Sequence, residues 1–259
     1  MRSTATVIGL GIACAVLSSC GHSHGFNAAQ AKQSAPGARS SNPATGQLTR
    51  PQAVAFARAV NLRSDDLPGF SASARRNRET QAEKRLGRQL LRCVGAVAEN
   101  GLAEVGSGDF ERRGLGSVLS VASNVSVTRT SALAARELSR LRSGRSRRCV
   151  ASYFRQLLQI QHLGSGTLGP VSVQHGTPPA PGAAGGFAWR ISATLTVHVN
   201  HGRLRSVRAP FYIDILGFVY GPAEVTLFSF GTPVPFPAAA QQHLYTLLLA
   251  RAKLTGTRG

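Results

Sequence analysis

Two stretches of alternating apolar and polar residues, joined by a short turn, constrain the fold of this chain most. In segment 189–199, apolar residues occupy every odd position and polar or charged residues every even one. The odd-numbered apolar row resumes in segment 207–215, after Asn200-His201-Gly202. A period of two with one apolar face predicts half-buried strands. A three-residue loop with Gly202 in the left-handed conformation keeps both rows on one face. The predicted cross-strand pairs are Leu195 with Val207 and Ile191 with Phe211.

The rest of the chain surrounds this hairpin with further strands and helices. Segment 223–230 is predicted to be the next strand, after a turn at 217–221, and segment 117–128 alternates more weakly. Apolar residues at helical spacing predict five helices. These helices are expected at 53–60, 79–97, 132–142, 148–161 and 237–252. The pattern predicts an α+β fold, an antiparallel sheet with helices packed on its apolar face in a single domain.

The N-terminus has the pattern of an exported lipoprotein. Arg2 precedes a short apolar stretch at 7–17, and Leu17-Ser18-Ser19-Cys20 is typical of a bacterial lipobox, in which the cysteine is lipidated. No apolar run is long enough for a spanning helix, so we expect lipid-anchored attachment on the extracytoplasmic face of the cell membrane. The alternative is an ordinary signal peptide that contains Cys20. The predicted parts are a signal peptide at 1–19, a disordered tether at 20–48, one domain at 49–254 and a disordered tail at 255–259.

The expected state of each cysteine follows from export to an oxidising compartment. Cys14 leaves with the signal peptide and Cys20 carries lipid, so Cys93 and Cys149 remain. Two thiols in an oxidising compartment most simply form one disulfide. Both lie on or beside apolar helical faces, which predicts a structural bridge from helix to helix.

The charge is strongly basic, with Lys+Arg 30 against Asp+Glu 11 and a formal net charge of +19. Basic residues cluster at 75–78, at 112–113 and at 140–148. Export removes nucleic acid as a partner, and aromatic residues for stacking on bases are only 6% of the chain. The remaining partners are the membrane itself, anionic lipid headgroups or anionic wall polymers. The alternative is a solvated cationic surface that binds nothing.

One polar cluster is a candidate for chemistry. A turn centred on Val219 would place Asp214 opposite Glu224, with Arg190 diagonal to Asp214. Such a group is either a salt-bridge cluster on a solvated sheet face or an acid–base pair, and the first is the commoner. His175, His198 and His201 lack the spacing of a metal site. Nucleophile-elbow, phosphate-loop and dinucleotide-binding motifs are absent, so we expect no enzyme activity, cofactor or metal.

The C-terminal segment 211–230, FYIDILGFVYGPAEVTLFSF, and the helix after it are similar to those of uncharacterised actinobacterial lipoproteins. With Leu67-Pro68-Gly69-Phe70 and the cysteine pair, they more distantly resemble the extracellular sensor-like domains of mycobacterial serine/threonine kinases. The resemblance implies an antiparallel sheet with packed helices, a ligand cleft and no enzymatic residues. We therefore predict a lipid-anchored, non-enzymatic binding or sensor-like domain. The alternatives are a cell-envelope hydrolase or transferase that uses Asp214 and Glu224, and a carrier of apolar ligands.

Overall fold

The computed structural model describes residues 48–73, 80–95, 101–160, 167–200 and 204–256, with side chains at all of these except 197–200 and 204–205. The described chain confirms the α+β class, with five α-helices and a nine-stranded antiparallel sheet. The main path of the sheet runs β1-β3-β4-β9-β8-β7-β5, with β2 paired to β4 and β6 paired to β7. The predicted signal peptide, its lipidated Cys20, nearly all of the tether and the last three residues lie outside the described residues.

The strands and helices follow the predicted order. The helices are α1 (Arg50–Val60), α2 (Gln81–Val94), α3 (Ser131–Leu141), α4 (Gly144–Ile160) and α5 (Ala238–Gly256), with a short 3-10 helix at Ser64–Asp66. The strands are β1 (Ser71–Ser73), β2 (Gly101–Gly106), β3 (Asp109–Gly114), β4 (Ser117–Thr128), β5 (Thr167–Leu168), β6 (Ser172–Gly176), β7 (Gly185–Asn200), β8 (Leu204–Tyr220) and β9 (Ala223–Thr232). The last helix therefore continues two residues beyond the predicted end of the domain.

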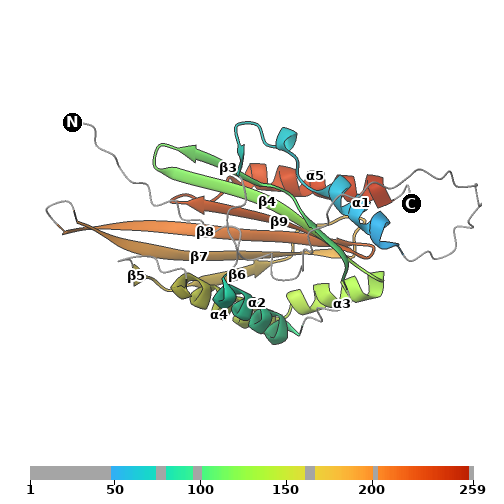
Figure 1. Cartoon of the computed structure of the whole chain (residues 1–259), viewed down its shortest axis with the longest axis horizontal. Helices are drawn as coiled ribbons and strands as arrows, with labels where there is room; N and C mark the ends of the chain where they lie inside the picture. The colour runs from blue at the N-terminus through green and yellow to red at the C-terminus, as the bar shows by residue number, and fades with distance from the viewer. Residues whose placement is uncertain (1–47, 74–79, 96–100, 161–166, 201–203, 257–259) are drawn as a thin grey trace, which may run out of the picture.

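Helices cover both faces of the sheet. Figure 1 shows α1 and α5 on one side, and α2, α3 and α4 together on the other. The sequence predicts that the helices, including the C-terminal one, lie over the apolar row that contains Trp189. That row is covered by α3 and α4, whereas α5 packs on the opposite face. The physical reason lies in the central strand β9, whose side chains are buried on both faces and so need a helix layer on each.

Capping residues define where three of the helices begin. Thr49 and Thr80 each form a capping box with the residue three positions later, Gln52 or Glu83, and Thr130 caps α3. These side chains satisfy backbone N–H groups that have no partner within the helix. Gly95, at φ 75°, ends α2 in the left-handed conformation that glycine adopts at low cost.

The β7–β8 hairpin has the predicted loop length but a different register. Asn200 pairs with Leu204, which leaves three residues between the strands. Leu195 pairs with Ala209 and Ile191 with Ile213, so every partner lies two positions beyond the predicted one. A shift of two keeps all side chains on their predicted faces. The conformation of Gly202 lies outside the described residues.

The β8–β9 turn lies at a different position from the predicted one, and this difference changes which residues share a face of the sheet. The chain reverses at Gly221-Pro222, between Tyr220 and Ala223, and not around Val219. Gly221 has φ 55°, which glycine accommodates in a tight turn. Val219 consequently pairs with Glu224, and Asp214 pairs with Ser229. The predicted pairing is therefore wrong by an odd number of residues, which moves Glu224 to the opposite face of the sheet from Asp214.

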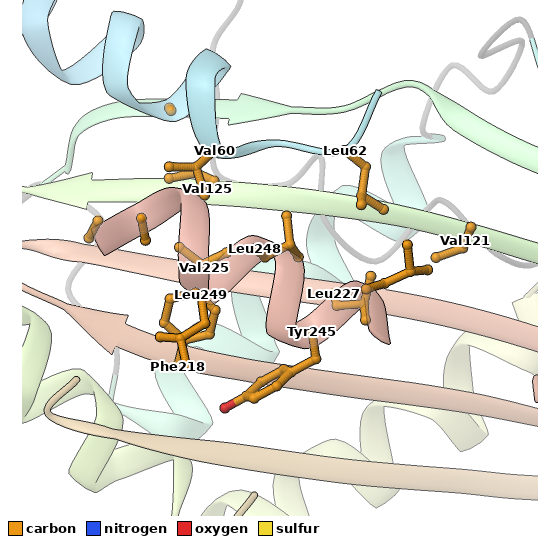
Figure 2. Packing of buried hydrophobic residues seen from close by; sticks show 14 of the residues in the cluster. Val60, Leu62, Val121, Val125, Phe218, Val225, Leu227, Tyr245, Leu248 and Leu249 are labelled. Atoms are coloured by element: carbon orange, nitrogen blue, oxygen red, sulfur yellow. The ribbon is translucent and has the colours of Figure 1, made fainter. Parts of the chain in front are cut away.

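The face under α1 and α5 forms a filled core. Val125 of β4, Val225 of β9 and Phe218 of β8 are fully buried beneath Leu248 of α5 (Figure 2). Ser123, which interrupts the apolar row of β4, donates from Oγ to Oδ1 of Asn61 at 2.7 Å just after α1. A buried polar residue with a partner of this kind fixes the position of the helix end.

The opposite layer is held together covalently as well as by packing. A disulfide joins Cys93 of α2 to Cys149 of α4, with a Cα–Cα distance of 5.8 Å, which confirms the predicted bridge from helix to helix. Phe154 and Leu157 of α4 are buried against the apolar row of β7 and β8. Leu86 is the buried apolar anchor of α2 in this layer.

Candidate functional site

A cavity of about 260 Å³ lies between the helix layer α2–α4 and the sheet. Three helices and five strands contribute to its wall, so residues from position 87 to position 228 meet there. Concave sites of this kind, mostly apolar with a few converging polar groups, are the usual form of small-molecule binding sites. The cavity is therefore the candidate functional site of the described chain.

Most of the cavity wall is apolar and aromatic. Helix α2 turns one side toward the cavity, with Gly87, Leu90, Leu91 and Val94 at helical spacing. The sheet and α4 supply the facing wall, which contains the single tryptophan of the chain. Its apolar members are Val150, Phe154, Phe187, Trp189, Ile215 and Phe228. An apolar body of a ligand could lose its hydration against these side chains.

The remaining wall is polar and contains three carboxylates. Glu104 comes from β2, Glu137 from α3 and Glu224 from β9, all half-buried. These are three of only 11 acidic residues in a chain of net charge +19, so their convergence is unlike the rest of the surface. The other polar members of the wall are Asn124, Ser126, Arg140 and Thr226.

Two of the carboxylates accept hydrogen bonds from neighbours on adjacent strands or the same strand. Asn124 donates from Nδ2 to Oε1 of Glu104 at 3.0 Å. Thr226 donates from Oγ1 to Oε1 of Glu224 at 3.3 Å. A carboxylate can accept several hydrogen bonds, so the contact from Thr226 leaves acceptor capacity on Glu224 for a ligand.

The electrostatic setting favours protonation of two of these groups. Burial raises the pKa of Glu224 to about 7, with a further rise from the charge of Glu137 and a smaller one from Glu104, against the hydrogen bond from Thr226. Burial also raises the pKa of Glu137, although the charge of Arg140 opposes the rise. Removal of carboxylates from water and their mutual repulsion both disfavour the charged forms. A cationic or hydrogen-bond-donating group placed here would relieve that repulsion.

The predicted polar-face cluster is only partly assembled. Arg190 lies directly opposite Asp214, not diagonal to it, and the two form a bidentate pair: Nε to Oδ1 at 2.6 Å and Nη2 to Oδ2 at 3.0 Å. The hydrogen bond that Arg190 donates to Asp214 is the main cause that raises the pKa of Arg190. Glu224 is on the other face, among the cavity residues. The carboxylate pair of Asp214 and Glu224 is therefore not formed, and Asp214 is engaged in an ion pair.

The structure gives no sign of a metal centre in the residues it describes. No three or more His, Cys, Asp or Glu among them are placed to hold an ion, and the three glutamates of the cavity do not qualify. His175 lies on β6 opposite Trp189. The side chain of His198 and all of His201 lie outside the described part. No helix within the described ranges is both long and apolar enough to span a bilayer.

A second hollow, of about 300 Å³, lies on the other side of the molecule near the start of α5. Its charged groups already have partners. Asp66 accepts two hydrogen bonds of 2.7 Å from Arg251, and Arg112 stacks over the ring of Phe70 at 5.1 Å. Charged groups that already have partners stabilise the fold and are less available to bind a ligand. The cavity under α2 is therefore the stronger candidate site.

The sequence alone did not point to the cavity residues. Glu104, Glu137 and Glu224 are far apart in the chain, and each sits in an element whose face depends on register and packing. Two local signals existed: Glu137 is the only acid in an otherwise cationic helix, and Glu224 is the second residue of a strand whose other residues are mostly apolar. Neither signal shows that the two residues meet.

Comparisons with known proteins do not assign the chain to a family. No protein-family model matches the chain, and no curated protein matches it. Among solved structures, the chain is similar to the extracellular domain of PknH from Mycobacterium tuberculosis, with a TM-score of 0.32 and 6% sequence identity over 82% of this chain and 100% of that one. At this TM-score and identity, the likeness carries no conclusion about the fold or the function of this chain.

Proposed function

We propose that the chain is a lipid-anchored, extracytoplasmic binding domain that takes up a small amphipathic molecule and does not transform it. The cavity between α2–α4 and the sheet is the observation that carries this proposal. Its apolar wall would hold the body of the ligand, and its glutamates would hold a polar end that donates hydrogen bonds or carries positive charge. Such a domain would act as a sensor or as a carrier, according to what happens after binding.

The proposed extracytoplasmic location rests on two features outside the cavity. The lipobox at Leu17-Ser18-Ser19-Cys20 supports export and an acyl anchor. The Cys93–Cys149 disulfide supports an oxidising compartment, because such bridges rarely persist in the cytosol. Mass spectrometry of the protein from its own membrane tests the anchor: the mature chain should begin at acylated Cys20. A cleaved chain without acyl groups would contradict it.

The cavity offers its own reporter of binding. Trp189 is the only tryptophan, is 4% exposed and lines the cavity wall. Decanol and decylamine are suitable probes, because they share one alkyl chain and differ only in the polar end. We expect both to change the fluorescence of Trp189 in a saturable way. The absence of a response to either probe would contradict the proposal.

A matched pair of variants shows whether the response comes from the cavity. Val94→Phe adds volume to the cavity wall on α2, and Val54→Phe makes the same change at a half-buried site on α1 in the opposite layer. We expect Val94→Phe to weaken probe binding about tenfold or more, since a filled cavity loses its contact area with the probe. Val54→Phe should leave the affinity unchanged. Equal effects of both variants would place the response elsewhere.

A hydrolase or transferase would have to use Glu137 and Glu224, because Asp214 and Glu224 do not form a pair. Asp214 is engaged with Arg190, but Glu137 and Glu224 share the cavity and have raised pKa values, as a general acid requires. Natural ligands that co-purify with the chain should be recovered at unchanged mass after incubation. Product formation that Glu224→Gln abolishes would favour the enzyme over the binding domain.

A further inference from the structure

The outer side of the α2–α4 helix pair carries two rows of arginine. On α2, Arg85, Arg88 and Arg92 follow one another at steps of three and four residues, which places them in one stripe. On α4, three exposed arginines also share one side of the helix, at steps of three and seven residues. They are Arg145, Arg148 and Arg155. All six side chains are exposed, on the sides of their helices turned away from the buried residues.

The charge of this surface is almost uncompensated within the described chain. Helix α4 has no acidic residue, and the one acid of α2, Glu83, is half-buried in a capping box. None of the six arginines forms an ion pair with another described residue. Arg140 and Arg142, close by in sequence, face elsewhere: Arg140 lines the cavity and Arg142 donates to the Gly186 carbonyl oxygen at 2.9 and 2.6 Å.

The helix pair presents these charges as one rigid unit. The Cys93–Cys149 disulfide joins the two helices directly beside Arg92 and Arg148. Guanidinium groups at fixed positions suit repeated phosphate groups, which they bind through paired N–H donors. We propose that the arginine face, Arg85, Arg88, Arg92, Arg145, Arg148 and Arg155, docks the domain on a membrane surface of anionic phospholipids.

The composition of the face favours a lipid surface over other polyanions. The exposed large apolar residues of the described chain are Leu115, Val207, Val234 and Leu254, none of them on α2 or α4. The face also exposes no aromatic ring for stacking on a base or sugar. Contact is therefore electrostatic, without insertion, and requires only a plane of negative charge. An acyl group at Cys20 would supply a second, independent attachment to the same membrane.

Vesicle partitioning tests this proposal independently of the cavity. The full chain carrying Cys20→Ser, which cannot be acylated, is sedimented with vesicles of phosphatidylcholine alone or of phosphatidylcholine with phosphatidylglycerol. We expect strong partitioning to the anionic vesicles that falls steeply with added salt, because surface attraction is screened by ions. The apolar stretch at 7–17 contributes equally to every variant and cancels in the comparison. Equal partitioning to both kinds of vesicle would overturn the proposal.

Two charge-matched triple variants locate the effect. Arg85→Gln/Arg88→Gln/Arg92→Gln removes three charges from the arginine face, and Arg50→Gln/Arg58→Gln/Arg63→Gln removes three exposed charges on and just after α1. Each basic residue at an anionic surface accounts for about a fivefold change in partitioning, so the first variant should lose about 100-fold. The second should lose less than about threefold, through net charge alone. Similar losses in both would overturn the proposal.

Two further measurements complete the test. Thiol titration in denaturant, together with circular dichroism, shows that each variant retains the disulfide and the fold. Soluble polyphosphate distinguishes a lipid surface from a polymer. If polyphosphate binds as tightly per phosphate as the vesicles do, and the α2 variant loses both equally, the face recognises polyanions in general and the proposal fails. Weak binding of polyphosphate supports the membrane surface.

Discussion

The two helix layers cover the same sheet in different ways. Under α1 and α5, Phe218, Tyr245 and Leu248 are fully buried, and the charged pair Arg251–Asp66 is closed by hydrogen bonds. Under α2–α4 a cavity remains, and the carboxylates of Glu104, Glu137 and Glu224 line it. The difference indicates that the first layer, apart from the hollow near the start of α5, mainly stabilises the fold, whereas the second layer leaves the cavity that forms the candidate site.

The largest expected effect comes from the bridge in the second layer. Cys93→Ala/Cys149→Ala should lower the free energy of unfolding by about 4 kcal/mol, because the disulfide closes a long loop in the unfolded chain. The sequence separation of the two cysteines is 56 residues. Urea unfolding of both proteins measures the change. A loss below about 1 kcal/mol would mean that packing alone holds α2 on α4.

A pair of leucine truncations compares the packing of the two layers. Leu248→Ala, at a site 0% exposed on α5, should cost about 3 kcal/mol in the free energy of unfolding, as expected for a filled core. Leu91→Ala, on the cavity wall of α2, should cost less than about 1 kcal/mol, because few contacts are lost there. Both values come from denaturant unfolding at one pH. Equal costs would contradict the idea that the second layer is the less filled one.

The pH dependence of stability should have opposite signs in the two layers. Burial raises the pKa of Asp66, but hydrogen bonds from Arg251 and from the backbone of Arg63, with the charges of both arginines, lower it more. Its folded pKa is below the ordinary 3.8, so its contribution is complete above that value and is lost as pH falls through the folded pKa. Asp66→Asn should remove about 2 kcal/mol at neutral pH, and much less in acid.

Glu224 should behave in the reverse way and with a smaller effect. Its folded pKa of about 7 lies above the ordinary 4.5, so the folded state holds more protons between these values and stability falls as pH rises through them. Glu224→Gln should therefore gain about 1 kcal/mol above pH ~8, less than the full shift implies because the side chain is only half-buried. The same unfolding measurements, at acid and alkaline pH, provide the check. A loss of stability in this variant would mean that the charged carboxylate is satisfied in the fold.

Local features of the sequence predicted most elements well, and the candidate site poorly. The five helices and the strands from β7 to β9 were predicted within a few residues, because periodicity and capping residues act over short distances. The short strands β1, β2, β3, β5 and β6 were not predicted, since they are held by cross-strand pairing more than by their own pattern. The strand predicted at 117–128 is confirmed as β4. Ser123, which interrupts its apolar row and weakened the prediction, is buried and contacts Asn61.

The basic cluster at 140–148 illustrates most clearly what the sequence alone does not predict. In the sequence it is a single run of arginine that could bind any polyanion. In the fold, Arg140 enters the cavity wall, Arg142 binds the backbone at Gly186, and Arg145 and Arg148 join the exposed face of α4. Arginines that are close together in a helical sequence point in different directions and so meet different surroundings. Only the packing of the helices specifies which surroundings each arginine meets.

The sequence by itself determined the five helices, the longer strands β4, β7, β8 and β9, the α+β class and the pairing of Cys93 with Cys149, because these depend on local periodicity and on a cysteine count. The tertiary structure decided the partners across β8 and β9, the division of the helices between two faces, and the meeting of Glu104, Glu137 and Glu224. The physical reason is that a turn shifted by a few residues costs little locally, yet an odd shift in register exchanges the two faces of a strand. The register that forms is the one that buries the side chains on both faces of the sheet at once. No short segment of the sequence contains that information.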